Sequence, residues 1–114
     1  MLIMRKLKLA RGDNMKDNII PTPTVGEILY EEFMEPAGIT AYRLAKDIHV
    51  PISRIQEILA NKRKITVDTS LRLAKYFSLS DRYFLEIQND IDVRNAKMAM
   101  EDDLVTIPVF RFAM

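Results

Sequence analysis

The feature that most constrains the fold is a pair of short amphipathic segments joined by a tight turn, within residues 40–64 (TAYRLAKDIHVPISRIQEILANKRK). Apolar residues recur three and four positions apart on each side of the turn, which predicts helices over about 40–48 and 51–60. Ala45 has almost no side chain, so the second helix can cross close over the first. The inward positions are Leu44, Ala45, Ile48, Val50, Ile55, Ile58 and Leu59. The pattern is typical of a helix-turn-helix, and also of an ordinary αα-hairpin.

The distribution of charge favours the first of these readings. The net charge of the 114-residue chain is only +1, but residues 40–64 carry six Lys and Arg against Asp47 and Glu57. A polyanion would need positive charge at this place, and the second helix of a helix-turn-helix lies in the DNA major groove. Residues 25–36 carry four Glu and no Lys or Arg, and residues 80–103 carry seven acidic residues against three basic ones. These acidic flanks indicate a second partner that is not DNA.

Several classes of function are excluded or disfavoured by what the chain lacks. There is no cysteine, so disulfides and thiolate metal sites are excluded, and a reducing, cytoplasmic location is expected. His49 is the only histidine and is expected to be a turn residue, because no second ligand or nucleophile is arranged around it. No Gly-rich phosphate loop is present. We expect no catalytic residue, no metal, no cofactor and no membrane span.

The rest of the chain predicts an all-α, five-helix fold. Thr24 and Glu27 match a capping box, and Pro36 with Gly38 is expected to end the first helix. Thr40, Thr66 or Asp68, and Ser80 are the expected caps of later helices, Pro51 belongs to the first turn of the third, and Asn61 is its left-handed stop. The remaining inward positions are Val25, Ile28, Leu29, Phe33, Leu71, Ala74 and Phe77. The apolar residues of the last helix face the core or a partner, namely Phe84, Leu85, Ile87 and Ile91.

The two ends of the chain are not expected to belong to the helical domain. Residues 1–22 are an expected extension, partly disordered, with a candidate strand at 6–9. Residues 23–101 form the predicted helix-turn-helix domain. Residues 102–114 form a tail in which LVTIPVFRF (104–112) is β-branched and aromatic, which predicts a short edge strand. Such a strand needs a partner, either its own copy in a dimer or the N-terminal segment.

A ladder of acids lies on the first predicted helix. Glu27, Glu31 and Glu35 recur every four residues, with Glu32 beside them. A metal site and a solvated helix face are both compatible with this spacing. Like charges four residues apart weaken a helix slightly, and a basic protein lying over them would reverse the sign of that effect. The ladder is therefore a candidate surface for a basic protein partner.

Residues 23–93 resemble the HigA-type antitoxins, also described as virulence-associated protein I-like members of the lambda-repressor-like helix-turn-helix class. The matching markers are GEIL, EEF and P, GIT, LA, V-P, RI-EI, N-KR-IT, DT-LRLA, and YFLEIQ followed by Asp90. Two departures are visible: His49 stands where the turn usually has Gly, and Trp is frequent where Tyr83 or Phe84 stands here. Histidine tolerates the left-handed region better than most residues.

The resemblance implies two activities. Such antitoxins bind and neutralise a HigB-type toxin, a small basic mRNA-cleaving ribonuclease of the RelE-like class. They also repress their own operon by binding a palindromic operator as a homodimer. A stand-alone phage-type repressor without a toxin is the alternative, and an adaptor that kept the fold without binding DNA is a third reading. A small basic reading frame beside the gene would favour the antitoxin.

The resemblance also implies a set of DNA-binding residues. On the outer side of the second helix of the motif, Gln56 and Arg54 suit adenine and guanine edges, and Glu57 could accept from cytosine or form an ion pair with Arg54 or Lys62. Thr40 directs an N–H and a hydroxyl at phosphate. The complete set is Thr40, Ile52, Ser53, Arg54, Gln56, Glu57, Asn61, Lys62, Arg63 and Lys64, and the toxin-binding set is Glu27, Glu31, Glu32 and Glu35.

Overall fold

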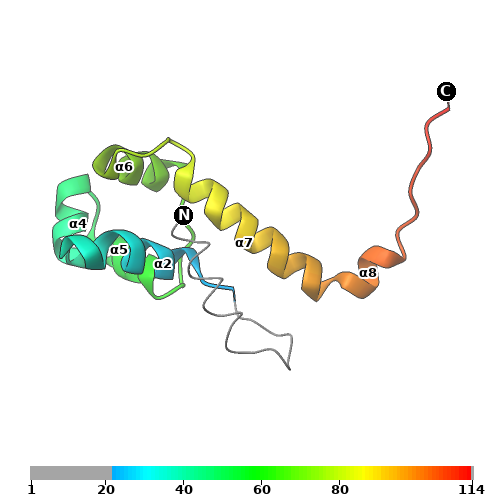
Figure 1. Cartoon of the computed structure of the whole chain (residues 1–114), viewed down its shortest axis with the longest axis horizontal. Coiled ribbons are helices and arrows are strands. Elements are labelled where there is room, and N and C mark those ends of the chain that lie inside the picture. Colours follow the sequence, from blue (N-terminus) through cyan, green and yellow to red (C-terminus); the bar gives the residue numbers. More distant parts are fainter. Residues whose placement is uncertain (1–21, 114) are drawn as a thin grey trace.

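The structure is a computed structural model and describes residues 22–113. Within this range every regular element is helical, as expected for an all-α fold. The order is α2 (Val25–Ile28), η1 (Leu29–Met34), α3 (Glu35–Ala37), α4 (Ala41–Ile48), α5 (Ile52–Leu59), α6 (Val67–Phe77), α7 (Tyr83–Ala99) and α8 (Glu101–Val105). Figure 1 shows α2 to α6 gathered around the start of α7, whose far half extends away. The expected extension over 1–22 and the strand at 6–9 lie almost wholly outside the described residues.

The first helix begins where local chemistry predicts. The hydroxyl of Thr24 accepts a hydrogen bond from the backbone N–H of Glu27, and the carboxylate of Glu27 accepts one from the N–H of Thr24, both at 3.0 Å. The predicted capping box is therefore confirmed. Both side chains satisfy N–H groups that a helix start leaves without partners.

Gly38 ends this helix as predicted, but the prediction that Pro36 would also end it was wrong. Elements α2, η1 and α3 are continuous, and the helix runs through Pro36 to end at Gly38, whose φ of 67° is left-handed. A proline in an α-helix presses its ring against the carbonyl four residues back. The turns of η1 are wider, with the Glu35 N–H donating to the Tyr30 carbonyl five residues back, and we attribute the tolerance of Pro36 to that width.

Gly26 sets the distance between the first helix and α5. A Cβ placed on Gly26 would lie 2.2 Å from the carbonyl oxygen of Ile58 and 3.1 Å from the Cα of Leu59. Only a residue without a side chain allows α2 to approach the α5 backbone this closely. The core around this crossing contains Val25, Leu29, Met34, Leu44, Ala45, Ile48, Ile55, Ile58, Ile65, Leu73 and Phe84. Most of the inward positions predicted for the helix-turn-helix are in this set.

An aromatic cluster joins the first helix to α6 and α7. The ring of Phe33 lies 5.2 Å from that of Phe77, 5.7 Å from that of Tyr83 and 5.3 Å from that of Phe84, measured between centroids. Tilted and edge-on pairs at these distances add to the stabilisation from burial. The cluster anchors the start of α7, which carries residues important for the site.

Two predictions about α6 and α7 were wrong. Leu71 is 45% exposed, and the buried face of α6 contains Leu73 instead. Ser80 does not cap α7: the helix begins at Tyr83, because Ser80 is the first residue of a turn in which its carbonyl accepts from the Tyr83 N–H. The hydroxyl of buried Ser70 donates to the Asp81 carbonyl at 2.8 Å and holds that turn.

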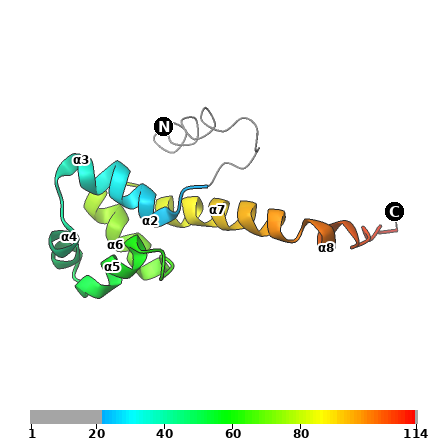
Figure 2. The ribbon, with the colours of Figure 1, turned by 90° about the horizontal axis from the view of Figure 1, so that it is seen from below.

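The predicted tail strand is absent from the described residues. The first part of the segment 104–112 belongs to α8, and the rest has no regular structure. A strand requires a neighbouring strand to satisfy its backbone groups, and residues 22–113 contain none. Figures 1 and 2 both show the tail continuing away from the other helices. A role of 102–114 in dimerisation stays a prediction.

Candidate nucleic-acid interface

Helices α4 and α5 form a helix-turn-helix whose turn is fixed from outside. His49 closes α4 with φ 66° and ψ 49°, the left-handed conformation predicted for it. The guanidinium of Arg72 on α6 donates to the carbonyls of Ile48 and His49, at 2.8 and 3.3 Å. A cation at the last carbonyls of a helix complements the helix dipole. Arg72 thereby ties the turn to α6 and fixes the direction in which α5 leaves it.

The outer face of α5 is accessible. Ile52, Ser53 and Gln56 are exposed, and the Gln56 amide makes no hydrogen bond with any residue of 22–113. Pro51 is the N-cap and not part of the first turn, with an extended ψ of 146°, so the helix proper begins at Ile52. Buried Ile55 and Ile58 hold the opposite face in the core. The exposed face therefore offers one apolar side chain, one hydroxyl and one carboxamide.

Arg54 is held by neighbours on α6. Its guanidinium donates to the Asp68 carboxylate at 2.8 Å and to the Thr69 hydroxyl at 3.4 Å, and its side chain is 29% exposed. Asp68 also accepts from Arg72 at 3.1 Å. The hydrogen bonds from Arg72 and from Arg54 hold the pKa of Asp68 below its ordinary value. Arg54 is thus already engaged in the free protein, unlike Gln56.

The loop after α5 carries three basic residues in different states. Asn61 has φ 61°, as predicted for a left-handed stop. Lys62 makes no ion pair within residues 22–113. Arg63 donates to the Glu57 carboxylate at 2.7 Å, so the partner of Glu57 is Arg63 and not the predicted Arg54 or Lys62. Lys64 pairs with Asp92 of α7 at 2.8 Å.

The backbone of this loop is clasped by a side chain of α7. The Gln88 carboxamide accepts from the N–H of Ile65 at 2.7 Å and donates to the carbonyl of the same residue at 2.8 Å. Ile65 is only 2% exposed, so water cannot replace both bonds readily. Gln88 therefore fixes the end of the loop that carries Lys62 relative to the helical core.

Thr40 has a definite local role at the start of α4. Its hydroxyl accepts from the Arg43 N–H at 3.1 Å, which confirms the predicted cap. Farther along α4, the Asp47 carboxylate accepts from the Tyr76 hydroxyl at 2.6 Å and from Arg43 at 3.2 Å. The bond from Tyr76, and after it those from Arg43, lower the pKa of Asp47, and the same bond raises the pKa of Tyr76. Together these contacts link α4 to α6.

The acidic ladder lies on α2, η1 and α3. Glu35 is exposed, Glu31 and Glu32 are half-buried, and the Glu27 carboxylate serves the capping box. The described residues contain no group of three side chains able to hold a metal ion. None of their helices combines the length and apolar character required to cross a bilayer.

Sequence reasoning missed the residues that position the interface from a distance. Arg72, Gln88, Tyr76 and Asp68 contact the motif from α6 and α7, 14 to 29 positions away along the chain. Gln88 stands among the apolar positions of α7, and a polar residue there is the one signal that could have drawn attention to it. Local periodicity gives no indication of the ion pairs that Arg54, Arg63 and Lys64 form.

The fold and this surface define the class: a helix-turn-helix protein with a cationic loop after its second motif helix. The helix-turn-helix family profile matches residues 31–84. Virulence-associated protein I of Dichelobacter nodosus is 40% identical over 92 residues, covering 81% of this chain and 85% of that protein.

Solved structures give the same assignment. Antitoxin GraA in complex with its operator has a TM-score of 0.74 at 27% identity, over 88% of this chain and all of that one. The Pseudomonas aeruginosa antitoxin HigA with the higBA promoter has a TM-score of 0.72 at 26% identity, over 78% and 98%. The chain belongs to the HigA-type, virulence-associated protein I-like family of helix-turn-helix antitoxins.

Proposed function

We propose that this antitoxin represses its own operon by placing α5 in the major groove of a palindromic operator, and that it neutralises a basic HigB-type toxin. The observation that carries the DNA part is the outer face of α5, where Gln56 is exposed and uncommitted beside the Lys62 loop. The solved structures of relatives with operator or promoter DNA support the same role. A protein acting on its own operon works in the bacterial cytoplasm.

The contacts divide the proposed DNA-binding residues by role. Gln56 reads a base, because a carboxamide can form hydrogen bonds with both the N6 and the N7 atoms of adenine. Ile52 contacts a thymine methyl group. Ser53, Asn61, Lys62 and the Thr40 helix start position the backbone of the duplex. Three of the proposed residues form ion pairs within the protein, namely Arg54, Arg63 and Lys64. Each of them would contact DNA only after its ion pair with a carboxylate is broken. Glu57 chiefly orients Arg63.

Substitution of Gln56 by alanine is expected to relax sequence preference. The carboxamide has no structural role in the described residues, so the variant should keep the wild-type stability. Loss of one bidentate base contact removes about 1–3 kcal/mol of discrimination. Competition anisotropy between operator and a scrambled duplex measures this difference. An unchanged ratio of affinities would mean that α5 does not lie in the groove as proposed.

Substitution of Lys62 by alanine is expected to weaken operator and scrambled duplexes alike. Each lost phosphate contact should flatten the slope of log K against log salt by about 1. Arg63→Ala should do the same and also leave Glu57 without its partner. Lys97→Ala, an exposed lysine on the far part of α7, is the matched control and should leave the slope unchanged. Equal slopes for all four proteins would exclude the loop from the interface.

The acidic ladder is the proposed toxin surface, and its test separates the two activities. We expect Glu31→Gln with Glu35→Gln to weaken binding of the toxin while operator affinity is kept. Lys62→Ala is the reciprocal control, which should lose DNA and keep toxin. Calorimetry with the purified toxin gives the first quantity and anisotropy the second. If the double variant changed both affinities equally, or neither, the ladder would not be the toxin surface.

A dimer completes the proposal for DNA. Two copies reading half-sites about 34 Å apart bury the area that tight operator binding needs. The deciding experiment is a titration of the DNA upstream of the gene, followed by co-expression with the neighbouring reading frame and pull-down. Operator binding with toxin capture supports the whole proposal. Operator binding alone favours a stand-alone repressor, and toxin capture without operator binding favours an adaptor.

A further inference from the structure

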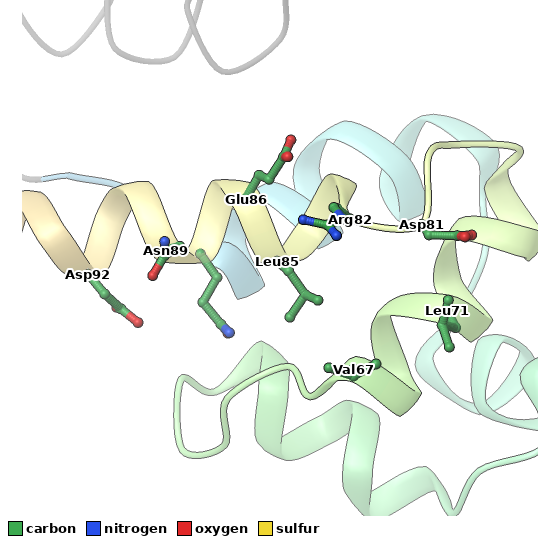
Figure 3. Close-up of a pocket in the computed structure, with 9 residues that line it drawn as sticks. Val67, Leu71, Asp81, Arg82, Leu85, Glu86, Asn89 and Asp92 are labelled. Carbon is green, nitrogen blue, oxygen red and sulfur yellow. The ribbon is translucent and has the colours of Figure 1, made fainter.

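A groove of about 570 Å³ lies between the start of α6 and the first half of α7. Figure 3 shows Leu85 of α7 pointing toward Val67 of α6 across this groove, with Leu71 one turn farther along α6. Val67 is 62% exposed, and Leu71 is 45% exposed. The charged residues that line the groove are three acids, Asp81, Glu86 and Asp92, and one base, Arg82. The groove is therefore an apolar floor with an excess of acidic charge around it.

The C-terminal tail presents a matching set of exposed apolar side chains. From Val105 onward its large apolar side chains are 61% to 81% exposed, namely Val105, Ile107, Val109, Phe110 and Phe112. The only charged side chain after Asp103 is Arg111, which stands between the two phenylalanines. A contiguous apolar segment of this kind marks an interaction site. Its single cation complements the acidic lining of the groove.

We propose that the groove between α6 and α7 receives the C-terminal tail of a second copy of this chain, with Phe110 or Phe112 on Val67 and Leu71. This inference rests on the proposed dimer and specifies how it is built. A two-fold axis perpendicular to α7 would place two copies of this helix antiparallel, which brings the end of one chain toward the α7 start of the other. Both copies then fill each other's groove, as a closed symmetric dimer requires.

The tail of the same chain is too short to occupy the groove. The helix rise from Leu85 to Ala99 is about 21 Å, and α8 lies beyond that point. Reversing at Thr106, the chain could cover about 20 Å before Phe112 if fully extended. Figure 2 shows the tail running on in the direction of α7, away from the start of that helix. The tail would therefore have to come from another molecule.

The groove also adjoins the proposed DNA-binding loop. Gln88 and Asp92 line it, and these are the residues that hold Ile65 and Lys64 in the described structure. A tail seated in the groove would pack against the side chains that fix the loop carrying Lys62. The dimer contact would then support the loop on which the proposed phosphate contacts depend.

Engineered cysteines test this arrangement directly, because the chain has none of its own. A Leu71→Cys chain mixed with a Phe110→Cys chain should give a covalent dimer under mild oxidation. A Tyr30→Cys chain, whose exposed tyrosine (44%) lies on η1, replaces Leu71→Cys in the control and should give at most a tenth of that yield. Equal yields in the two mixtures would overturn the proposal. So would a chain with both Leu71→Cys and Phe110→Cys that closes a disulfide at the mass of one chain.

Sedimentation equilibrium gives an independent reading with full-length variants. Burial of one phenylalanine suffices for about a 100-fold change in affinity, so Phe110→Ser with Phe112→Ser should raise the dimer dissociation constant at least that much. Val67→Glu with Leu71→Glu should do likewise, and Tyr30→Glu should not. Unchanged constants in both double variants would contradict the groove contact. Wild-type operator binding without the cross-link rejects only the groove, whereas the cross-link without operator binding rejects only the proposed repressor function.

Discussion

Replacing Gly26 by alanine is expected to lower the free energy of unfolding by about 3 kcal/mol, at the upper end of overpacking effects. The added Cβ would lie 2.2 Å from the Ile58 carbonyl oxygen, and the obstacle is backbone that cannot rotate away. Either α2 or α5 must shift, and the Thr24 cap and the core contacts around Ile58 move with it. Urea unfolding followed by circular dichroism at 222 nm measures the change.

The sign of this effect discriminates between packing and propensity. Alanine is favoured over glycine in a helix by about 1 kcal/mol, so the variant would be more stable if α2 stood clear of α5. A stabilised Gly26→Ala protein would therefore contradict the close crossing described here. The same variant should also weaken operator binding, because α5 would change its position relative to α4.

Replacing Gln88 by leucine is expected to lower the free energy of unfolding by about 2 kcal/mol. The variant keeps the size of the side chain but leaves the N–H and C=O of buried Ile65 without partners, and each unmet buried group costs about 1–3 kcal/mol before water or relaxation recovers part of it. Because the loop is no longer clasped, operator affinity should fall as well. Chemical unfolding and anisotropy measure the two effects.

Asn95→Leu is the matched control for this prediction. It introduces the same side chain farther along α7, at an exposed residue whose side chain makes no hydrogen bond with residues 22–113. Its free energy of unfolding should equal that of the wild type. If Gln88→Leu unfolded at the same urea concentration as Asn95→Leu, the clasp on Ile65 would contribute nothing.

Features that depend on neighbouring residues could be predicted from the sequence. The Thr24 capping box and the Thr40 cap follow from side chains that reach a backbone N–H three residues on. The left-handed residues His49 and Asn61 follow from helix ends and from the tolerance of these side chains for positive φ. The inward positions of α4 and α5 follow from helical periodicity.

Features that depend on residues distant in sequence could not be predicted. The exposed Leu71 and buried Leu73 differ by half a helical turn on α6, and only the placement of α7 decides which one faces the core. No local sequence pattern indicates that Glu57 forms an ion pair with Arg63, or that Lys64 forms one with Asp92. The tail resembles a strand in composition, but a strand exists only with a partner strand, and residues 22–113 supply none.

The proposed placement of α5 in the major groove is tested by mapping amide chemical shifts of the 15N-labelled protein as its operator duplex is added. The largest changes are expected at Ser53, Gln56 and Lys62, with smaller ones at Thr40 and Arg43. Amides of the acidic helix, such as Glu31 and Glu35, should remain unshifted. Shifts concentrated on the acidic helix, with the outer face of α5 unaffected, would contradict this placement.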